Sequence, residues 1–155
     1  MTSILSKLGP RKPTQRAIGA RAWYERGLAA EAIGDLAGAR AAYVRALAAN
    51  PELPDAACNL GRLLHEAGDV LGAEQWYRVA LLGARDVATY WFNLGVAVED
   101  QDRAAEAIAC YERALACEPR LAEAHFNLAR IYERAGAVDV PRAAVRHLSS
   151  YRTFA

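Results

Sequence analysis

The sequence lacks the features that mark metal-binding, secreted and membrane-spanning proteins. It has only three cysteines, Cys58, Cys110 and Cys117, and no CxxC pair, which argues against a zinc site and a disulfide framework. No apolar run approaches the roughly 18–20 residues that a membrane-spanning helix needs, and residues 1–15 show no signal-peptide core or cleavage site. We therefore expect reduced thiols, no bound metal, no membrane insertion and a cytoplasmic location.

An excess of charge of one sign is also missing. The chain carries 19 basic and 18 acidic side chains, for a net charge of +1, which argues against nucleic-acid binding driven by the whole surface. Residues 1–19 hold four of the basic side chains but no aromatic ring. Because aromatic stacking normally accompanies basic residues in single-strand binding, we expect no nucleic-acid partner.

The signatures of common catalytic sites are absent as well. The sequence contains no GxSxG, no HExxH and no phosphate-binding glycine loop. Of the three histidines, His65 has no nucleophile beside it in the sequence and His147 lies near the C-terminus. We expect no enzymatic activity and no cofactor.

What the sequence does contain is a period of 34 residues. Residues of one kind recur at this spacing, without insertion or deletion, across 20–121. The recurring positions are Gly27, Gly61 and Gly95; Ala39, Ala73 and Ala107; Tyr43, Tyr77 and Tyr111; Ala46, Ala80 and Ala114; and Leu47, Leu81 and Leu115. A fixed period of this length is typical of a solenoid built from one supersecondary unit.

Each unit has the pattern of two helices joined by a short turn. In the third unit the predicted helices cover 88–101 and 104–117. The turns that separate the helices contain Asp35, Asp69 and Asp102. We predict that these carboxylates accept hydrogen bonds from free N–H groups at the start of the following helix.

The small recurring residues predict close packing inside each helix pair. Glycine in a helix interior costs about 1 kcal/mol relative to alanine, so the recurrence of Gly27, Gly61 and Gly95 indicates a close crossing of the two helices. The recurring tyrosines would fill the volume where the helices diverge. Pro51 and Pro119 would end the second helix of their units, since proline disfavours helix in the residue before it.

These positions resemble the signature of the tetratricopeptide repeat family: Trp, Leu-Gly, a large apolar residue, Ala, an aromatic residue, Ala and Pro over 34 residues. The third unit fits best, with Trp91, Leu94, Gly95, Val98, Ala107, Tyr111, Ala114 and Pro119. The resemblance implies an all-α, right-handed solenoid of antiparallel helix pairs. The expected organisation is a flexible basic arm over 1–19, repeats over 20–53, 54–87 and 88–121, and a degenerate fourth repeat with a capping helix over 122–155.

The fourth unit departs from the pattern. His125 stands in the tryptophan position, and Pro141 falls where the small alanine is expected. Three extra residues restore the register. We predict a closing helix over 142–153, with Pro141 tolerated in its first turn, and a packed structural role for His125.

The resemblance also implies that the first helix of each pair lines a concave groove. There one column of residues holds Asn59, Asn93 and Asn127. An amide offers both donors and an acceptor, so this column could bond the backbone of an extended peptide whatever its sequence. A similar asparagine ladder is used by the tetratricopeptide superhelix of the enzyme that transfers N-acetylglucosamine to Ser and Thr. The alternative is a role in folding or solubility.

Aromatic and basic side chains accompany these amides. Phe92 and Phe126 would be exposed or half-exposed beside the ladder, where apolar groups often mark binding sites. Arg62 and Arg130 could pair with a carboxylate of a ligand, or with glutamates of the chain itself. The candidate peptide-binding residues are Tyr24, Asn59, Arg62, Phe92, Asn93, Val96, Phe126, Asn127 and Arg130. The glutamates considered as internal partners are Glu66, Glu99 and Glu133.

The net charge of the repeats and the residue types in the groove indicate which kind of partner the chain could bind. The second and third units carry net charges of −2 and −3, which favours a partner with basic residues near the middle of the groove. The subclass that clamps acidic C-terminal tails of heat-shock chaperones requires Lys and Arg in the groove. Only Asn59 matches that subclass, and the remaining positions hold Tyr24, Leu28, Thr89 and Asn93.

The sequence therefore favours a non-catalytic protein-interaction module, or adaptor, that binds an extended peptide segment of a partner. Two alternatives stay open. One is a substrate-presenting accessory subunit or domain of a protein-modifying enzyme such as a glycosyltransferase. The other is a scaffold that self-associates.

Overall fold

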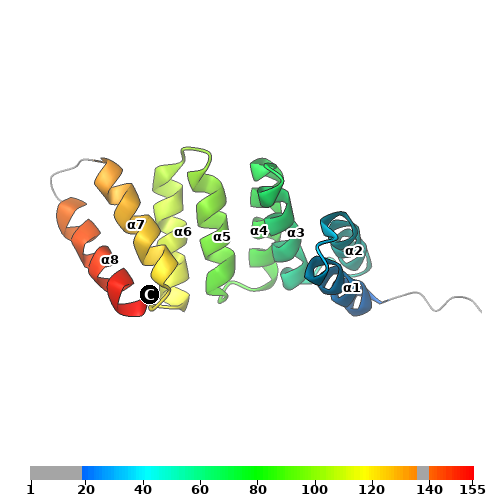
Figure 1. Cartoon of the computed structure of the whole chain (residues 1–155). Helices are drawn as coiled ribbons and strands as arrows, with labels where there is room; N and C mark the ends of the chain where they lie inside the picture. The colour runs from blue at the N-terminus through cyan, green and yellow to red at the C-terminus, as the bar shows by residue number, and fades with distance from the viewer. Residues whose placement is uncertain (1–18, 136–139) are drawn as a thin grey trace, which may run out of the picture.

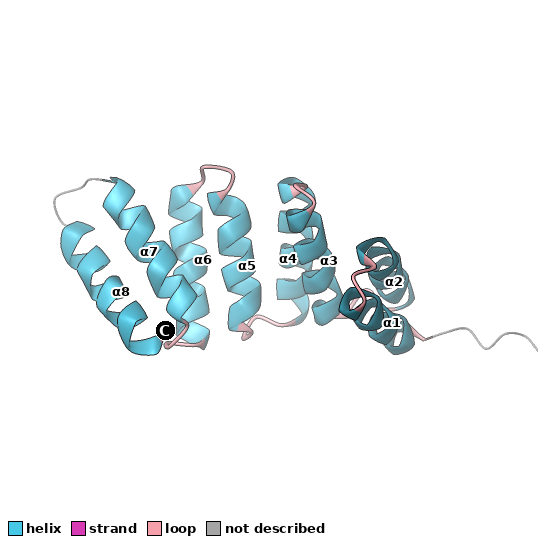
Figure 2. Ribbon diagram, viewed as in Figure 1, coloured by secondary structure: helices cyan, strands magenta, loops and turns pink. Residues whose placement is uncertain are grey.

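The computed structural model describes residues 19–135 and 140–155, and these residues form helices and no strands (Figure 2). The helices are α1 (Ala20–Ala32), α2 (Leu36–Ala49), α3 (Pro54–Glu66), α4 (Val70–Gly83), α5 (Ala88–Glu99), α6 (Ala104–Cys117), α7 (Ala122–Ala135) and α8 (Val140–Phe154). Each odd-numbered helix pairs with the even-numbered helix that follows it, and the pairs stand in a row from α1–α2 to α7–α8 (Figure 1). The predicted all-α solenoid is confirmed, while most of the predicted arm lies outside the described residues.

The helix ends differ slightly from the prediction. Helix α5 ends at Glu99, two residues before the predicted end, and α8 extends over Val140–Phe154. Pro141 is the second residue of α8, a position where the missing N–H would have no partner within the helix.

A tyrosine ring occupies the space that each recurring glycine leaves. A β-carbon added at Gly95 would lie 2.6 Å from a ring carbon of Tyr111, and the corresponding distances at Gly27 and Gly61 are 2.3 and 2.8 Å. The three tyrosines concerned are among the largest fully buried side chains. The glycine is therefore needed mainly because a ring of the second helix rests on it. The ring fills the point where the two helices cross, and not only the volume where they diverge.

Two of the three predicted aspartate caps are present. Oδ1 of Asp35 accepts a hydrogen bond from the backbone N–H of Gly38 at 2.8 Å, and Oδ1 of Asp69 accepts one from Gly72 at 2.9 Å. The prediction for Asp102 is wrong, because this residue lies one position earlier in the repeat.

Asp102 takes the place of the turn glycines. Its φ of 59° lies in the left-handed region, as do those of Gly34 (77°) and Gly68 (85°). Arg103 is the residue that precedes α6, and its side chain makes no capping hydrogen bond. The place of the aspartate in the repeat, and not its residue type alone, decides whether it caps the helix.

The turn before α6 lacks the aspartate cap, and it also carries a side chain where the other two turns have a glycine three residues after the cap. A β-carbon at Gly72 would lie 2.4 Å from Oδ2 of Asp69, so a capping carboxylate excludes a side chain there. In the turn of the third repeat, Glu106 stands at the position equivalent to Gly72 and forms an ion pair with Arg103. An ion pair thus stands where the other two turns have a cap, and the backbone N–H of Glu106 donates to the carbonyl of Arg103 at 3.1 Å.

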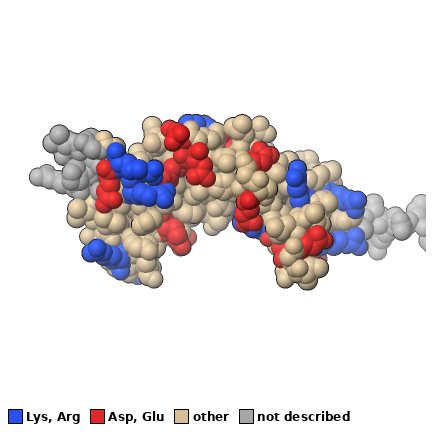
Figure 3. All heavy atoms as spheres, turned by 45° about the horizontal axis from the view of Figure 1, so that its top comes forward, with Lys and Arg blue, Asp and Glu red and all other residues tan. Residues whose placement is uncertain are grey.

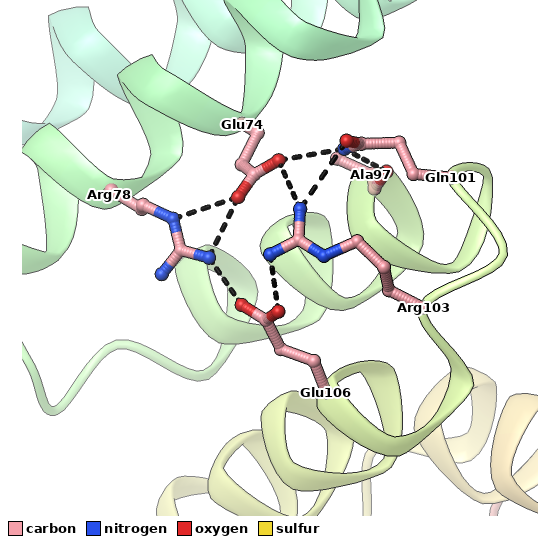
Figure 4. A network of polar contacts seen from close by, with 6 residues as sticks. All are labelled: Glu74, Arg78, Ala97, Gln101, Arg103 and Glu106. Carbon is pink, nitrogen blue, oxygen red and sulfur yellow. Dashed lines mark hydrogen bonds and ion pairs between the residues drawn. The ribbon is translucent and has the colours of Figure 1, made fainter.

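The same ion pair belongs to a network that joins α4 to the next helix pair (Figure 4). Glu74 is only 8% exposed and accepts hydrogen bonds from Arg78 and Arg103, each at 2.7 Å, and from Gln101 at 2.8 Å. Both arginines also contact Glu106. Burial opposes ionisation of Glu74, but these hydrogen bonds outweigh it and lower its pKa to about 2.

His125 has the packed structural role predicted for it. It is 9% exposed, and its Nε2 donates to the carbonyl of Pro119 at 2.9 Å. One period earlier, the indole Nε1 of Trp91 donates to the carbonyl of Arg85 at the same distance. Histidine therefore preserves the hydrogen bond of the tryptophan that it replaces.

The two kinds of turn respond differently to substitution. Asp69→Ala should lower the free energy of unfolding by about 1 kcal/mol, because it removes a helix cap. Asp102→Gly should raise it by about 0.5 kcal/mol, because glycine adopts a positive φ without a steric penalty. Urea unfolding of both variants measures the difference. Equal losses would show that Asp102 is a cap after all.

The Glu74 network predicts a dependence of stability on pH. Because folding lowers the pKa of Glu74 from 4.5 to about 2, its contribution is complete above pH 4.5 and is lost as the pH falls toward 2. The urea midpoint of the wild type should therefore exceed that of Glu74→Gln near neutral pH, and the gap should shrink on acidification. Glu112→Gln, at an exposed position on α6, is the control and should parallel the wild type. A gap that stays constant down to about pH 2 would contradict the assignment.

Candidate functional site

The nine candidate residues all lie on odd-numbered helices. Their places are Tyr24 on α1; Asn59 and Arg62 on α3; Phe92, Asn93 and Val96 on α5; and Phe126, Asn127 and Arg130 on α7. Phe126 and Arg130 are exposed and the others are half-buried. We call the solvent-facing side of α1, α3, α5 and α7 that carries them the odd-helix surface.

A chain of polar contacts links α1 to α3 across this surface. The hydroxyl of Tyr43 donates to Glu31, and Nδ2 of Asn59 donates to the same hydroxyl oxygen at 3.3 Å. The guanidinium of Arg62 contacts Glu31 and also Glu66, at 2.6 Å. A buried tyrosine of the first helix pair thus connects the acidic and amide side chains of two successive odd helices.

The same arrangement recurs between α5 and α7. The hydroxyl of Tyr111 donates to Glu99 at 2.8 Å and accepts from Nδ2 of Asn127 at 3.1 Å. Glu99 is also paired with Arg130 at 2.7 Å and with Arg134 at 2.6 Å. Burial and the hydrogen bond to Glu99 both raise the pKa of Tyr111, so its hydroxyl stays a donor throughout the physiological range.

The middle of the surface, between α3 and α5, is built differently. His65 stands where the other junctions have a glutamate, and its Nε2 lies 2.7 Å from Oδ2 of Asp100. Val96 stands where they have an arginine. Nδ2 of Asn93 lies 3.4 Å from Sγ of Cys58, which is a weak acceptor. Asn93 is therefore held less firmly than the amides on either side.

Aromatic rings lie beside the amides, each resting on a ring of the even helix in its own pair. The distances between ring centroids are 5.8 Å for Tyr24–Tyr43, 5.7 Å for Phe92–Tyr111 and 5.2 Å for Phe126–Tyr151. Such tilted pairs are favourable arrangements. Phe126 remains 41% exposed, so it offers apolar surface without being loose.

The amides keep unused hydrogen-bonding capacity. The bonds of Asn59, Asn93 and Asn127 described above all use Nδ2. A side-chain amide has two N–H donors and a carbonyl oxygen with two lone pairs. Among the described contacts, each of these residues therefore retains one N–H and its carbonyl oxygen for another molecule.

Arg62 and Arg130 pair with glutamates of the chain itself, which was the second of the two interpretations that the sequence allowed. Arg62 pairs with Glu66, Arg130 pairs with Glu99, and the additional partner Glu31 was missed. A signal for it exists in the sequence. Glu31 and Glu99 are two periods apart, as are Arg62 and Arg130, so an alternation over two repeats could have shown that they pair.

Two features of other functional classes are absent from the residues that the structure describes. Within residues 19–135 and 140–155, no three His, Cys, Asp or Glu side chains are grouped so that they could hold a metal ion. In the same ranges, no helix combines the length and apolar character needed to cross a membrane.

Comparison with protein families gives a consistent result. A sequence model described as "Tetratricopeptide repeat" matches residues 15–54 and 24–86, and another described as "TPR repeat" matches 100–136. Together these ranges include more than half of the chain. A curated relative, the peroxisomal targeting signal receptor of Eremothecium gossypii, is 34% identical over 88 residues. That match includes 56% of this chain but only 16% of the receptor's length.

Solved structures share the fold at low sequence identity. The crystal structure of MamA protein is 22% identical with a TM-score of 0.78, over 87% of this chain and 72% of that one. The first TPR of Spaghetti (RPAP3), solved with the HSP90 peptide SRMEEVD, is 24% identical with a TM-score of 0.72, over 76% of this chain and 94% of that one. The repeated glycine–tyrosine packing, the matched sequence models and these structures agree, and the chain belongs to the tetratricopeptide repeat family.

Proposed function

We propose that this chain is a non-catalytic protein-interaction module that binds an extended segment of a partner protein along the odd-helix surface. The observation that carries the proposal is the row of Asn59, Asn93 and Asn127 on three successive odd helices. Their carbonyl oxygens make none of the hydrogen bonds that the structure describes.

The spacing of the amides suits a peptide backbone. Side chains of successive odd helices reach one another, as Asn93 reaches Cys58 at 3.4 Å, so these helices lie one helix diameter, roughly 10 Å, apart. An extended chain rises about 3.3 Å per residue. Amides on successive odd helices would therefore meet backbone groups about every third residue of the bound segment. Because each amide can both donate and accept, such contacts depend little on the side chains of the segment.

The half-exposed rings add apolar contact beside this row. Phe92 and Phe126 are held by ring–ring packing, so little conformational entropy is lost when a partner covers them. Aromatic side chains in such positions often contribute most of the binding energy at interfaces.

The net negative charge of the middle repeats favours a segment with basic side chains through a long-range effect, because the glutamates of the odd-helix surface are themselves paired with arginines. On the face shown in Figure 3, acidic side chains lie across the middle of the molecule and the larger basic patches lie toward its two ends. The net charges of −2 and −3 for 54–87 and 88–121 agree with this distribution. Complementary charge would speed association and select among partners.

Recognition by amides and rings differs from recognition of an acidic tail by lysine and arginine. The RPAP3 structure holds a peptide that contains two glutamates and ends in aspartate. In this chain, the positions where the chaperone-binding subclass has Lys or Arg hold Tyr24, Leu28, Thr89 and Asn93. Arg62 and Arg130 are already paired with glutamates of the chain. We therefore assign the recognition to amides and rings.

Removing the amides tests the proposal. Peptides selected from a random display library on the wild-type protein, then labelled with a fluorophore, should bind the Asn93→Ala/Asn127→Ala variant at least about tenfold more weakly, since two backbone contacts are lost. Methylation of backbone nitrogens in the peptide should weaken binding more than changes of its side chains. Fluorescence anisotropy measures both effects.

The controls separate binding from folding. Gln75→Ala removes an exposed amide of α4 and should leave affinity unchanged. Asn127→Ala should cost about 1 kcal/mol of stability because it loses the bond to Tyr111, and Asn93→Ala should cost less. Unchanged affinity in a double variant that circular dichroism shows to be folded would refute the proposal.

A further inference from the structure

A recess away from the odd-helix surface lies between α4 and α6. Its volume is about 570 Å³, and none of the nine candidate residues lines it. The lining residues are Arg78, Leu81, Leu82, Arg85, Trp91, Leu94, Arg113, Ala116 and Cys117. We call this recess the arginine cleft.

The charge of the arginine cleft is opposite to that of its surroundings. The two repeats that form it, residues 54–121, contain eleven acidic residues and six arginines. Three of those six arginines line this one recess, and no acidic residue is among its lining residues. Positive charge is thus concentrated at one place on an otherwise acidic part of the solenoid.

This concentration does not follow from the repeat pattern. Arg78, Arg85 and Arg113 occupy three different positions of the repeat. One period earlier, these positions hold Val44, Pro51 and Val79, and only the position of Arg113 has an arginine in the first unit, Arg45. In particular, Arg85 replaces the proline that ends the repeat in the first and third units. The packing of a tetratricopeptide solenoid does not require arginine at any of the three positions.

The arginines differ in how far they are already paired. Arg78 holds Glu74 and Glu106 through Nε and Nη2, while its Nη1 takes no part in these bonds (Figure 4). Arg85 and Arg113 form no ion pair with any residue in the described part of the chain, and both are exposed. These two side chains therefore supply the net positive charge of the cleft.

Apolar groups line the same space. Leu82 is 75% exposed, and Trp91 is fixed by its indole hydrogen bond to the carbonyl of Arg85. Leu82 also borders a second recess of about 580 Å³, whose other lining residues are Pro51, Glu52, Leu53, Pro54, Val79 and Gly83. The two recesses share Leu82 at the C-terminal end of α4, and an elongated surface of this kind suits a chain segment better than a small molecule.

We propose that the arginine cleft binds an acidic segment of a partner protein that also carries a large apolar side chain. The guanidinium groups of Arg85 and Arg113 present planar donor pairs that match carboxylates, and Leu82 and Trp91 cover the apolar side chain. This site is independent of the odd-helix surface and has the opposite charge preference.

Two arginine substitutions test the proposal. Peptides from a random display library that are rich in Asp and Glu and contain Leu, Phe or Trp should bind the wild-type chain. They should bind the Arg85→Gln/Arg113→Gln variant at least about tenfold more weakly. They should bind Asn93→Ala/Asn127→Ala with unchanged affinity, which separates this site from the proposed function. Arg40→Gln, at an exposed arginine of α2, is the matched control and should not change binding.

Cys117 provides a local readout of occupancy. It is exposed and lines the cleft, whereas Cys58 and Cys110 are buried and burial raises the pKa of each thiol to about 11. A bound acidic peptide should slow alkylation of Cys117 by neutral iodoacetamide several-fold, and inorganic phosphate at the same concentration should not.

Three outcomes would overturn the proposal. The first is selection of no acidic–apolar peptide that depends on Arg85 and Arg113. The second is binding of such peptides without protection of Cys117. The third is equal protection by phosphate, which would mean that the cleft recognises anions alone. Folding of the double variant is checked by its urea midpoint, which should match the wild type because neither side chain forms a described contact within the fold.

Discussion

The contact between a tyrosine ring and a glycine determines most of this structure. In each of the first three helix pairs the ring lies so close to the glycine that a β-carbon could not fit. The same tyrosine positions side chains of two helix pairs: within its own pair the hydroxyl of Tyr111 donates to Glu99 and its ring supports Phe92, and in the next pair the hydroxyl accepts from Asn127. One residue thus fixes the spacing of two helices and positions side chains of the candidate binding surface.

Much of the fold could be predicted because a solenoid repeats its own local rules. The 34-residue period showed the helix pairs, the packing glycines and two of the three caps. The prediction failed at Asp102, where a residue type that suits a cap stands one position too early and adopts a positive φ instead. Turn chemistry depends on register, and residue type alone identifies it poorly.

The candidate site was only partly predictable, for a physical reason. Positions on the odd helices followed from periodicity, but whether a charged side chain is free depends on its neighbours in the adjacent repeat. Glu31 and Glu99 neutralise Arg62 and Arg130, and for this reason we assign recognition to the amides in the proposed function. The arginine cleft escaped the sequence entirely, because its three arginines come from three unrelated repeat positions that only the folded chain brings together. We therefore propose two binding surfaces of opposite charge preference, one along the odd helices and one across the end of α4.

A double-mutant cycle on Gly95 and Tyr111 tests the central claim most directly. If the ring occupies the space that the glycine leaves, Gly95→Ala should lower the free energy of unfolding by about 1–3 kcal/mol in the wild-type background. In a Tyr111→Leu background the same change should cost almost nothing, since the smaller side chain leaves room and alanine favours the helix. An equal cost of Gly95→Ala in both backgrounds, measured by urea unfolding, would contradict the account.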